Sequence, residues 1–176
     1  MRRGDPAPMW SMPPFTLSMI NGKGVRVTLF VSGCSHHCPG CFNQKAWNED
    51  YGKQYTQEVE DQIIEYLKVP YIDGLTFLGG EPMEPSHQEY VWKLIERVRK
   101  ELPDKNIWLY SGSTLEQLRS MDTPYAKNIL ANVDVLVDGR FVQALKDPDL
   151  AFKGSSNQRI IDMRKTGDGE PVLLDL

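Results

Sequence analysis

Four short apolar segments that each run into a glycine constrain the fold more than any other feature of the chain. They are residues 25–31 before Gly33, residues 75–78 before Gly79, residues 107–110 before Gly112, and residues 133–137 before Gly139. Each is rich in β-branched and aromatic residues and mostly apolar on both faces, which is typical of buried strands in a parallel sheet. The sequence therefore predicts a mainly parallel sheet built on these strands.

Helical segments are expected between the strands, at residues 56–68, 86–102 and 115–119, because apolar residues recur there with helical spacing. The predicted N-terminal caps are Thr56, a capping box of Ser86 with Glu89, and Ser113 or Thr114. Strands that alternate with helices indicate right-handed βαβ units. Because four strands are too few for a complete eight-stranded barrel, the expected fold class is α/β, as a partial, open TIM-like β/α barrel with a mainly parallel sheet.

The length of 176 residues suits one domain with a real core. We expect a disordered leader at residues 1–14, the folded domain at residues 15–162, and a C-terminal tail at residues 163–176. No apolar run approaches the roughly 20 residues of a membrane helix, and the N-terminus does not read as a secretory signal. The net charge of −4 supplies no broad positive surface. A cytoplasmic protein with no membrane and no nucleic-acid partner is therefore expected.

The three cysteines of the chain, Cys34, Cys38 and Cys41, lie within eight consecutive positions. An odd number cannot form a complete disulfide framework, and such close spacing indicates a metal site. One alternative is zinc with His36 or His37 as a fourth ligand, although a tetrahedron closed within so short a loop would be strained. The other, favoured by the lack of a fourth cysteine, is a [4Fe-4S] cluster that leaves one iron open to substrate.

The ends of the predicted strands form one candidate rim, because the carboxyl ends of parallel strands meet at the same edge of a sheet and carry its active sites. Every predicted strand ends in a glycine beside a small polar or acidic residue, and glycine is suited to sharp turns and close ligand approach. The cysteine loop follows the first of these strands. We therefore expect the metal site to lie on this rim.

The C-x3-C-x2-C spacing followed by Phe42, with Gly79-Gly80-Glu81 after the second strand, resembles the radical S-adenosylmethionine superfamily. The resemblance implies a radical SAM type fold, a cluster that reductively cleaves S-adenosyl-L-methionine to a 5'-deoxyadenosyl radical, and no separate catalytic side chains. It implies the metal ligands Cys34, Cys38 and Cys41 and cofactor contacts from Gly40, Cys41, Phe42, Gly79, Gly80, Glu81, Ser111, Gly112 and Asp138. Within this set, Gly79-Gly80-Glu81 would hold the methionine ammonium, Phe42 with the Gly40-Cys41 backbone would face the adenine, and the last strand ends would face the ribose or the sulfonium.

Longer matching segments resemble one family more closely: the activating component of anaerobic (class III) ribonucleotide reductase. The matching segments include VTLFVSGC, CPGCFNQKAW, KNIWLYSG, VDVLVDGRFVQALKDPDL and KGSSNQRIID. The resemblance implies an activase that abstracts a hydrogen atom from a glycine of the large reductase subunit, leaving a glycyl radical. It also implies a reduced flavodoxin-type protein as electron donor.

Four positions depart from the commonest pattern of that family: Lys23 replaces proline, Phe42 tyrosine, Glu81 aspartate and Lys153 arginine. Residues 154–159 could either dock the partner or close the fold. The alternatives left open are an activase of another glycyl radical enzyme such as pyruvate formate-lyase, a small-molecule radical enzyme, and a non-enzymatic zinc or iron–sulfur module. Gly79-Gly80-Glu81 argues against the last, and the C-terminal half argues against the other two.

Overall fold

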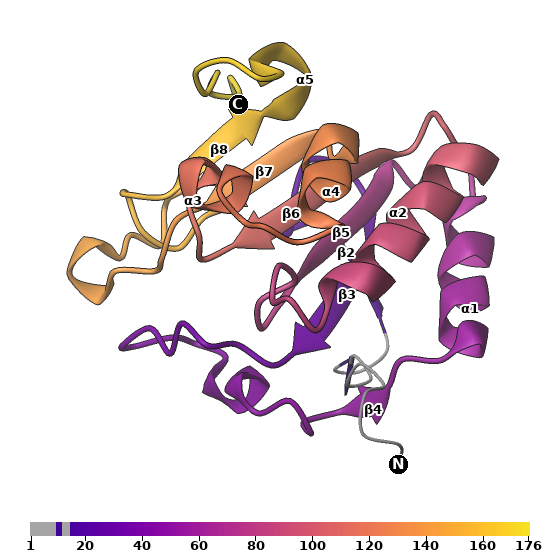
Figure 1. Cartoon of the computed structure of the whole chain (residues 1–176), viewed down its shortest axis with the longest axis horizontal. Coiled ribbons are helices and arrows are strands. Elements are labelled where there is room, and N and C mark those ends of the chain that lie inside the picture. Colours follow the sequence, from indigo (N-terminus) through magenta and orange to yellow (C-terminus); the bar gives the residue numbers. More distant parts are fainter. Residues whose placement is uncertain (1–9, 12–14) are drawn as a thin grey trace.

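The computed structural model describes residues 10–11 and 15–176, so the predicted disordered leader lies outside the described residues except at its positions 10–11. The described chain forms one eight-stranded sheet in the order β4-β1-β3-β5-β6-β7-β8, with β2 also paired to β3 (Figure 1). The strands are β1 (Trp10–Ser11), β2 (Thr16–Ser18), β3 (Arg26–Ser32), β4 (Lys53–Gln54), β5 (Gly74–Gly79), β6 (Asn106–Ser111), β7 (Val135–Asp138) and β8 (Arg159–Asp162).

The centre of the sheet is parallel. β3, β5, β6 and β7 run in one direction, with Leu29 opposite Phe77 and Phe77 opposite Leu109. These are the four glycine-ended strands, so the predicted α/β fold with a mainly parallel sheet is confirmed. The strands β1, β2 and β8, which the sequence patterns did not indicate, pair antiparallel with their neighbours. Because β4 and β8 stand at opposite ends of the strand order, the described sheet is open.

The described helices are α1 (Gln57–Leu67), α2 (Gln88–Glu101), α3 (Leu115–Arg119), α4 (Ala126–Asn132), α5 (Met163–Thr166) and the 3₁₀ segments η1 (Gln44–Trp47) and η2 (Gln143–Leu145). The Thr56 cap of α1 is confirmed, as is a cap at Thr114, which forms a capping box with Gln117. The capping box predicted from Ser86 and Glu89 is wrong. Because the His87 N–H closes a turn on the Glu84 carbonyl at 2.8 Å, α2 begins only at Gln88 and has no side-chain cap.

The two faces of the sheet are covered differently. One face carries the main core, in which Leu29, Phe77 and Leu109 pack with apolar residues of α1 to α4. Figure 1 shows α1, α2 and α4 in front of the sheet. The opposite face carries a smaller cluster around Trp108 and Val137, covered in part by Phe152 from the segment before β8. The helices therefore leave this second face to loops, and a cavity lies there.

The C-terminal residues 163–176, predicted to be a tail, return along β8. Helix α5 begins directly after that strand. The Asp162 N–H donates a hydrogen bond to the Val172 carbonyl, and the Leu174 N–H donates one to the Ile160 carbonyl, both at 2.8 Å. In the described part of the chain, no helix combines the length and apolar character that a membrane span requires.

The parallel register brings four strand ends to one edge. Val31 of β3 pairs with Gly79 of β5, and Ser111 of β6 pairs with Asp138 of β7. The loops that follow β3 and β7 both extend from this edge, to the left in Figure 1. The segments that carry the cysteines, Gly79-Gly80-Glu81 and the last two strand ends are thus neighbours, as the sequence predicted.

Candidate functional site

The cysteine loop leaves β3 through Gly33, which has a positive φ of 100°. Its start is fixed by hydrogen bonds to η1: the Gly33 N–H donates to the Ala46 carbonyl at 2.8 Å, and the Cys34 N–H donates to the Trp47 carbonyl at 3.3 Å. Within the loop the Cys41 N–H donates to the Cys38 carbonyl at 3.0 Å. All three cysteines are free and partly buried. The three thiols therefore lie on a loop whose backbone is held by hydrogen bonds to η1 and within the loop itself.

A cavity of about 140 Å³ lies beneath this loop at the strand ends. The residues predicted for the site that line it are Cys34, Cys38, Cys41, Phe42, Gly79, Gly80, Ser111 and Gly112. A larger neighbouring cavity of about 450 Å³ is lined by Gly40 and shares Cys41 and Phe42 with the first. Among the predicted residues, Glu81 and Asp138 line neither cavity. The fold thus brings the thiols, the glycines and one serine to a common space.

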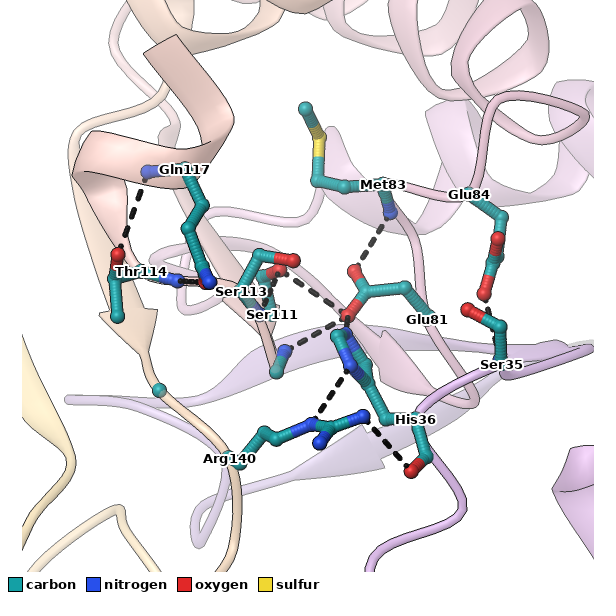
Figure 2. Close-up of polar contacts among 12 residues, drawn as sticks. Ser35, His36, Glu81, Met83, Glu84, Ser111, Ser113, Thr114, Gln117 and Arg140 are labelled. Atoms are coloured by element: carbon teal, nitrogen blue, oxygen red, sulfur yellow. Dashed lines mark hydrogen bonds and ion pairs between the residues drawn. The ribbon is translucent and has the colours of Figure 1, made fainter. Parts of the chain in front are cut away.

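Glu81 is buried, with 3% of its surface exposed, and its carboxylate is occupied by donors from the protein itself (Figure 2). Oε1 accepts the Met83 N–H at 2.9 Å. Oε2 accepts the Gly112 N–H at 2.8 Å, the Ser111 hydroxyl at 3.1 Å and His36 Nε2 at 2.7 Å. The carboxylate therefore joins the ends of β5 and β6 to the cysteine loop, and its predicted contact with the methionine ammonium stays a prediction.

Gly79 and Gly80 are needed for packing. Gly79 has a positive φ of 113°, and a Cβ at that position would lie 2.6 Å from the Val31 carbonyl oxygen. A Cβ on Gly80 would lie 2.3 Å from the Gly33 carbonyl oxygen. Both positions therefore admit only glycine. The close approach lets the Gly80 and Glu81 N–H groups donate to Val31 and Gly33 at 2.7 and 2.8 Å, which clamps the Gly-Gly-Glu segment to the cysteine loop.

Phe42 directly follows the last cysteine and is 90% exposed while lining both cavities. Its ring therefore does not take part in core packing. An exposed aromatic ring beside a cavity is suited to stacking on a planar ligand. Its predicted contact with adenine stays a prediction.

Asp138 lies at the end of β7, but its carboxylate is buried and lines neither cavity. It accepts the Leu115 N–H at 2.6 Å and the Arg159 Nε–H at 2.9 Å. Arg159 also donates to Glu116 at 3.0 Å. A cofactor contact through the Asp138 carboxylate would require Arg159 to move. The neighbouring residues Val137 and Gly139 line the smaller cavity in its place.

Several cavity residues were not singled out by the sequence analysis. Both cavities are lined by Tyr110, Phe141 and Gln158, and the smaller one also by Trp47. Gln158 also explains the segment 154–159, because its side chain accepts from the Gly154 N–H at 2.8 Å and donates to the Gly139 carbonyl at 2.9 Å. That segment therefore closes the loop after β7. The Gly-Ser-Ser-Asn-Gln pattern of this segment is typical of a turn. The sequence alone does not indicate that this turn contacts the loop after β7.

The Cys34 thiol, at the start of the cysteine loop, is partly buried. Burial raises the pKa of Cys34 to about 11, and the nearby Glu81 and Glu84 carboxylates act in the same direction. The thiol is therefore protonated at neutral pH in the metal-free protein. Metal binding must displace this proton, which couples metal affinity to pH.

Comparison with known proteins identifies the family. Residues 20–161 match the model of a 4Fe-4S single cluster domain. The anaerobic ribonucleoside-triphosphate reductase-activating protein of Vibrio cholerae serotype O1 is 48% identical over 148 residues, which is 83% of this chain and 93% of that protein. The protein of the same name from Escherichia coli K12 is 41% identical over 152 residues, 85% of this chain and 96% of its own. The chain belongs to the family of anaerobic ribonucleoside-triphosphate reductase-activating proteins.

A phage relative extends this activating-protein family. The protein of the same name from Enterobacteria phage T4 is 36% identical over 146 residues, which cover 83% of this chain and 89% of the phage protein. The coverage of all three relatives is nearly complete. The family resemblance inferred from the sequence segments is therefore confirmed.

The donor set of this family member fits an iron–sulfur cluster better than a zinc ion. His36 uses both ring nitrogens, one with Glu81 and one with Arg140, and His37 stacks on Trp47 with ring centroids 4.7 Å apart. In the described ranges, no three His, Cys, Asp or Glu side chains converge on a single ion. A cubane cluster needs no such convergence, because each thiolate binds a different iron.

Proposed function

We propose that this protein activates an anaerobic ribonucleotide reductase by generating a glycyl radical on its large subunit. One observation carries the proposal beyond family membership. The cavity lined by the three free cysteines is also lined by the ends of β5 and β6, so the predicted cluster ligands and the predicted cofactor-binding strand ends share one space. Because the cysteines supply only three thiolates, one iron of a four-iron cluster is left for a substrate.

Cys34, Cys38 and Cys41 would hold the [4Fe-4S] cluster. When bound, the cluster supplies the electron that cleaves S-adenosyl-L-methionine and so provides the 5'-deoxyadenosyl radical. The protein residues position the cofactor. The backbone at Gly79 and Gly80 lines the cavity and suits the methionine ammonium, since carbonyl oxygens accept hydrogen bonds from a cation. The exposed ring of Phe42 suits the adenine, and the Ser111-Gly112 segment lines the part of the cavity that the ribose or the sulfonium would occupy.

The larger cavity is where we place the target glycine of the reductase subunit. It shares Cys41, Phe42 and Tyr110 with the smaller cavity. Hydrogen-atom abstraction requires the reacting atoms to be in contact, so the glycine must enter a space continuous with the cofactor. Ile20, which is largely exposed, forms part of its lining. A mainly apolar cavity of about 450 Å³ accommodates a short loop of polypeptide.

Residues 15–162 would form the activase domain, as a partial, open TIM-like barrel of the radical SAM type, with residues 163–176 as a C-terminal extension. The one-sided arrangement of the helices and the four parallel strands support this. A reduced flavodoxin-type protein would supply the electron in the cytoplasm. We propose no membrane and no nucleic-acid partner, in keeping with the net charge of −4.

The test uses anaerobically reconstituted protein. We expect one [4Fe-4S] cluster per chain, reductive cleavage of S-adenosyl-L-methionine, and a glycyl radical signal by electron paramagnetic resonance when the anaerobic reductase subunit is added. The matched controls are a reductase subunit whose target glycine is changed to alanine and a pyruvate formate-lyase of the same organism. Stoichiometric zinc without cleavage would overturn the proposal, and a radical formed only on pyruvate formate-lyase would reassign the target.

A further inference from the structure

His36 sits between the first two cysteines, yet its side chain contacts other parts of the fold. Its Nε2 lies 2.7 Å from Oε2 of Glu81, in a pair whose side chains are only 15% and 4% exposed. Arg140, from the loop after β7, donates to the His36 ring and to the His36 carbonyl at 3.1 Å (Figure 2). A single residue of the cysteine loop thus contacts the segments that follow β5 and β7.

The contacts of His36 define which nitrogen carries its proton. Arg140 can only donate, so its Nε–H, at 3.3 Å, requires Nδ1 of His36 to accept. In the neutral ring the proton then lies on Nε2, which donates to Glu81. Arg140 is itself held, because its carbonyl accepts from the Asn157 side chain at 2.8 Å. The segment 154–159 therefore supports the loop that orients the histidine.

The acceptor of this bond is the point at which the strand ends meet. The Glu81 carboxylate also accepts from Met83, Ser111 and Gly112, so His36 is its only partner from the cysteine loop among the described residues. The ring lies against Gly112, where a Cβ would come within 2.4 Å of His36 Cδ2. Glycine at position 112 is thus required by the histidine.

A second tether holds the same loop. The Ser35 N–H donates to Glu84 Oε1 at 2.6 Å, in the turn that follows β5. This bond fixes the backbone near Cys34, while His36 fixes the stretch that leads to Cys38. The Ser35–Glu84 and His36–Glu81 hydrogen bonds together fix the distance between the cysteines and the ends of β5 and β6.

We infer that His36 is a positioning residue, which holds the cysteine loop at a fixed distance from the cofactor-binding strand ends through the Arg140–His36–Glu81 array. The inference rests on the proposed function, because it concerns where the cluster stands relative to S-adenosyl-L-methionine. Outer partners of metal ligands typically change affinity or activity about 10- to 100-fold when they are removed. A misplacement of about 1 Å is enough to cost a rate of about 100-fold.

The experiment compares the same substitution at two adjacent histidines. His36→Asn is too short to reach Glu81, whereas His36→Gln places an amide N–H near the position of the imidazole Nε2. His37→Asn is the matched control, because His37 makes a stacking contact with Trp47 and asparagine tolerates its positive φ of 45°. Each variant is reconstituted and assayed for iron and sulfide content, for the change that S-adenosyl-L-methionine causes in the paramagnetic spectrum of the reduced cluster, and for cofactor cleavage.

We expect His36→Asn to keep its iron and sulfide but to lose most of the cofactor-induced spectral change, with cleavage reduced about 10- to 100-fold. His36→Gln should regain much of both, and His37→Asn should match the wild type. The inference is overturned if His36→Asn behaves as the wild type, or if it loses the cluster as fully as Cys34→Ala, because the histidine would then serve only loop formation. A wild-type protein that shows neither cluster nor spectral change would overturn the proposed function itself.

Discussion

Each end of the parallel sheet has one buried ionisable side chain that hydrogen-bonds to several neighbouring segments: a basic one at the amino end and an acidic one at the carboxyl end. At the amino end, Arg26 is fully buried and makes five hydrogen bonds to the starts of the strands and the preceding loop. Its shortest contacts are to Thr76 Oγ1 and Asn106 Oδ1, both at 2.6 Å. At the carboxyl end, Glu81 collects four donors from the strand ends and the cysteine loop. In each case one buried ionisable side chain cross-links neighbouring strands through several hydrogen bonds.

The ends differ in what the charged group holds. The partners of Arg26 are oxygens of strand residues and of the loop before β3, and its guanidinium lies 5.4 Å from the centre of the Trp108 ring. Burial lowers the pKa of Arg26 to about 10, with Asp73 acting in the opposite direction. Glu81 instead shares its carboxylate with a loop that carries three thiols beside a cavity. We therefore expect changes at the amino end to reduce stability and changes at the carboxyl end to reduce activity.

The largest effect is expected from Cys34→Ala. The cluster loses a ligand, so cofactor cleavage should fall below detection, while the free energy of unfolding of the metal-free protein should change by less than about 1 kcal/mol. Iron analysis and urea denaturation measure the two quantities. Retained cleavage would contradict the assignment of Cys34 as a ligand.

Arg26→Met comes next and acts at the opposite end. Several buried oxygens lose their donor, and we expect the free energy of unfolding to fall by about 3 kcal/mol. Cluster content and cofactor cleavage at low temperature should remain those of the wild type, because Arg26 lies far along the strands from the thiols. A loss of cleavage without a loss of stability would break the distinction between the two ends.

Glu81→Gln sharpens the same distinction at the carboxyl end. The amide keeps the size of the side chain but replaces one acceptor oxygen with a donor that faces other donors. We expect the cluster to be retained and the affinity for S-adenosyl-L-methionine to fall about 10- to 100-fold. Binding measured by the spectral change of the reduced cluster tests this. If the variant bound the cofactor as tightly as the wild type does, the carboxylate would have only a packing role.

Glu116→Gln should have the smallest effect, because this carboxylate forms an exposed ion pair with Arg159 and is 55% exposed. The hydrogen bond from Arg159 lowers the pKa of Glu116 to about 2 from its ordinary value of 4.5. The contribution of the Glu116–Arg159 ion pair to the free energy of unfolding is therefore present above about pH 4.5 and is lost as the pH falls toward 2. After allowance for solvent screening, the change in unfolding free energy at pH 7 should stay below about 0.5 kcal/mol. A change above about 1 kcal/mol would show that Glu116 is needed to hold Arg159 on Asp138.

Much of the site could be predicted from short-range patterns. The four glycine-ended strands indicated which segments meet at one edge. The spacing of Cys34, Cys38 and Cys41 favoured a [4Fe-4S] cluster over a zinc ion. The strands β1, β2, β4 and β8 could not be predicted in the same way, because they are two to four residues long and none of them is an apolar segment that runs into a glycine, as β7 is. The capping box at Ser86 failed because a turn closed by the Glu84 carbonyl delays the start of α2.

Glu81 and His36 mark the boundary between what the sequence determined by itself and what only the tertiary structure decided. The sequence determined the parallel sheet and predicted the three cysteines as the ligand set, because spacing and periodicity are local properties of the chain. It placed Glu81 at the rim and His36 in the loop, but it did not indicate that the two side chains meet. That contact joins residues 45 positions apart, and only the packing of β3 against β5 brings them within 2.7 Å. Long-range polar contacts of this kind depend on register and close glycine packing, which no local pattern encodes.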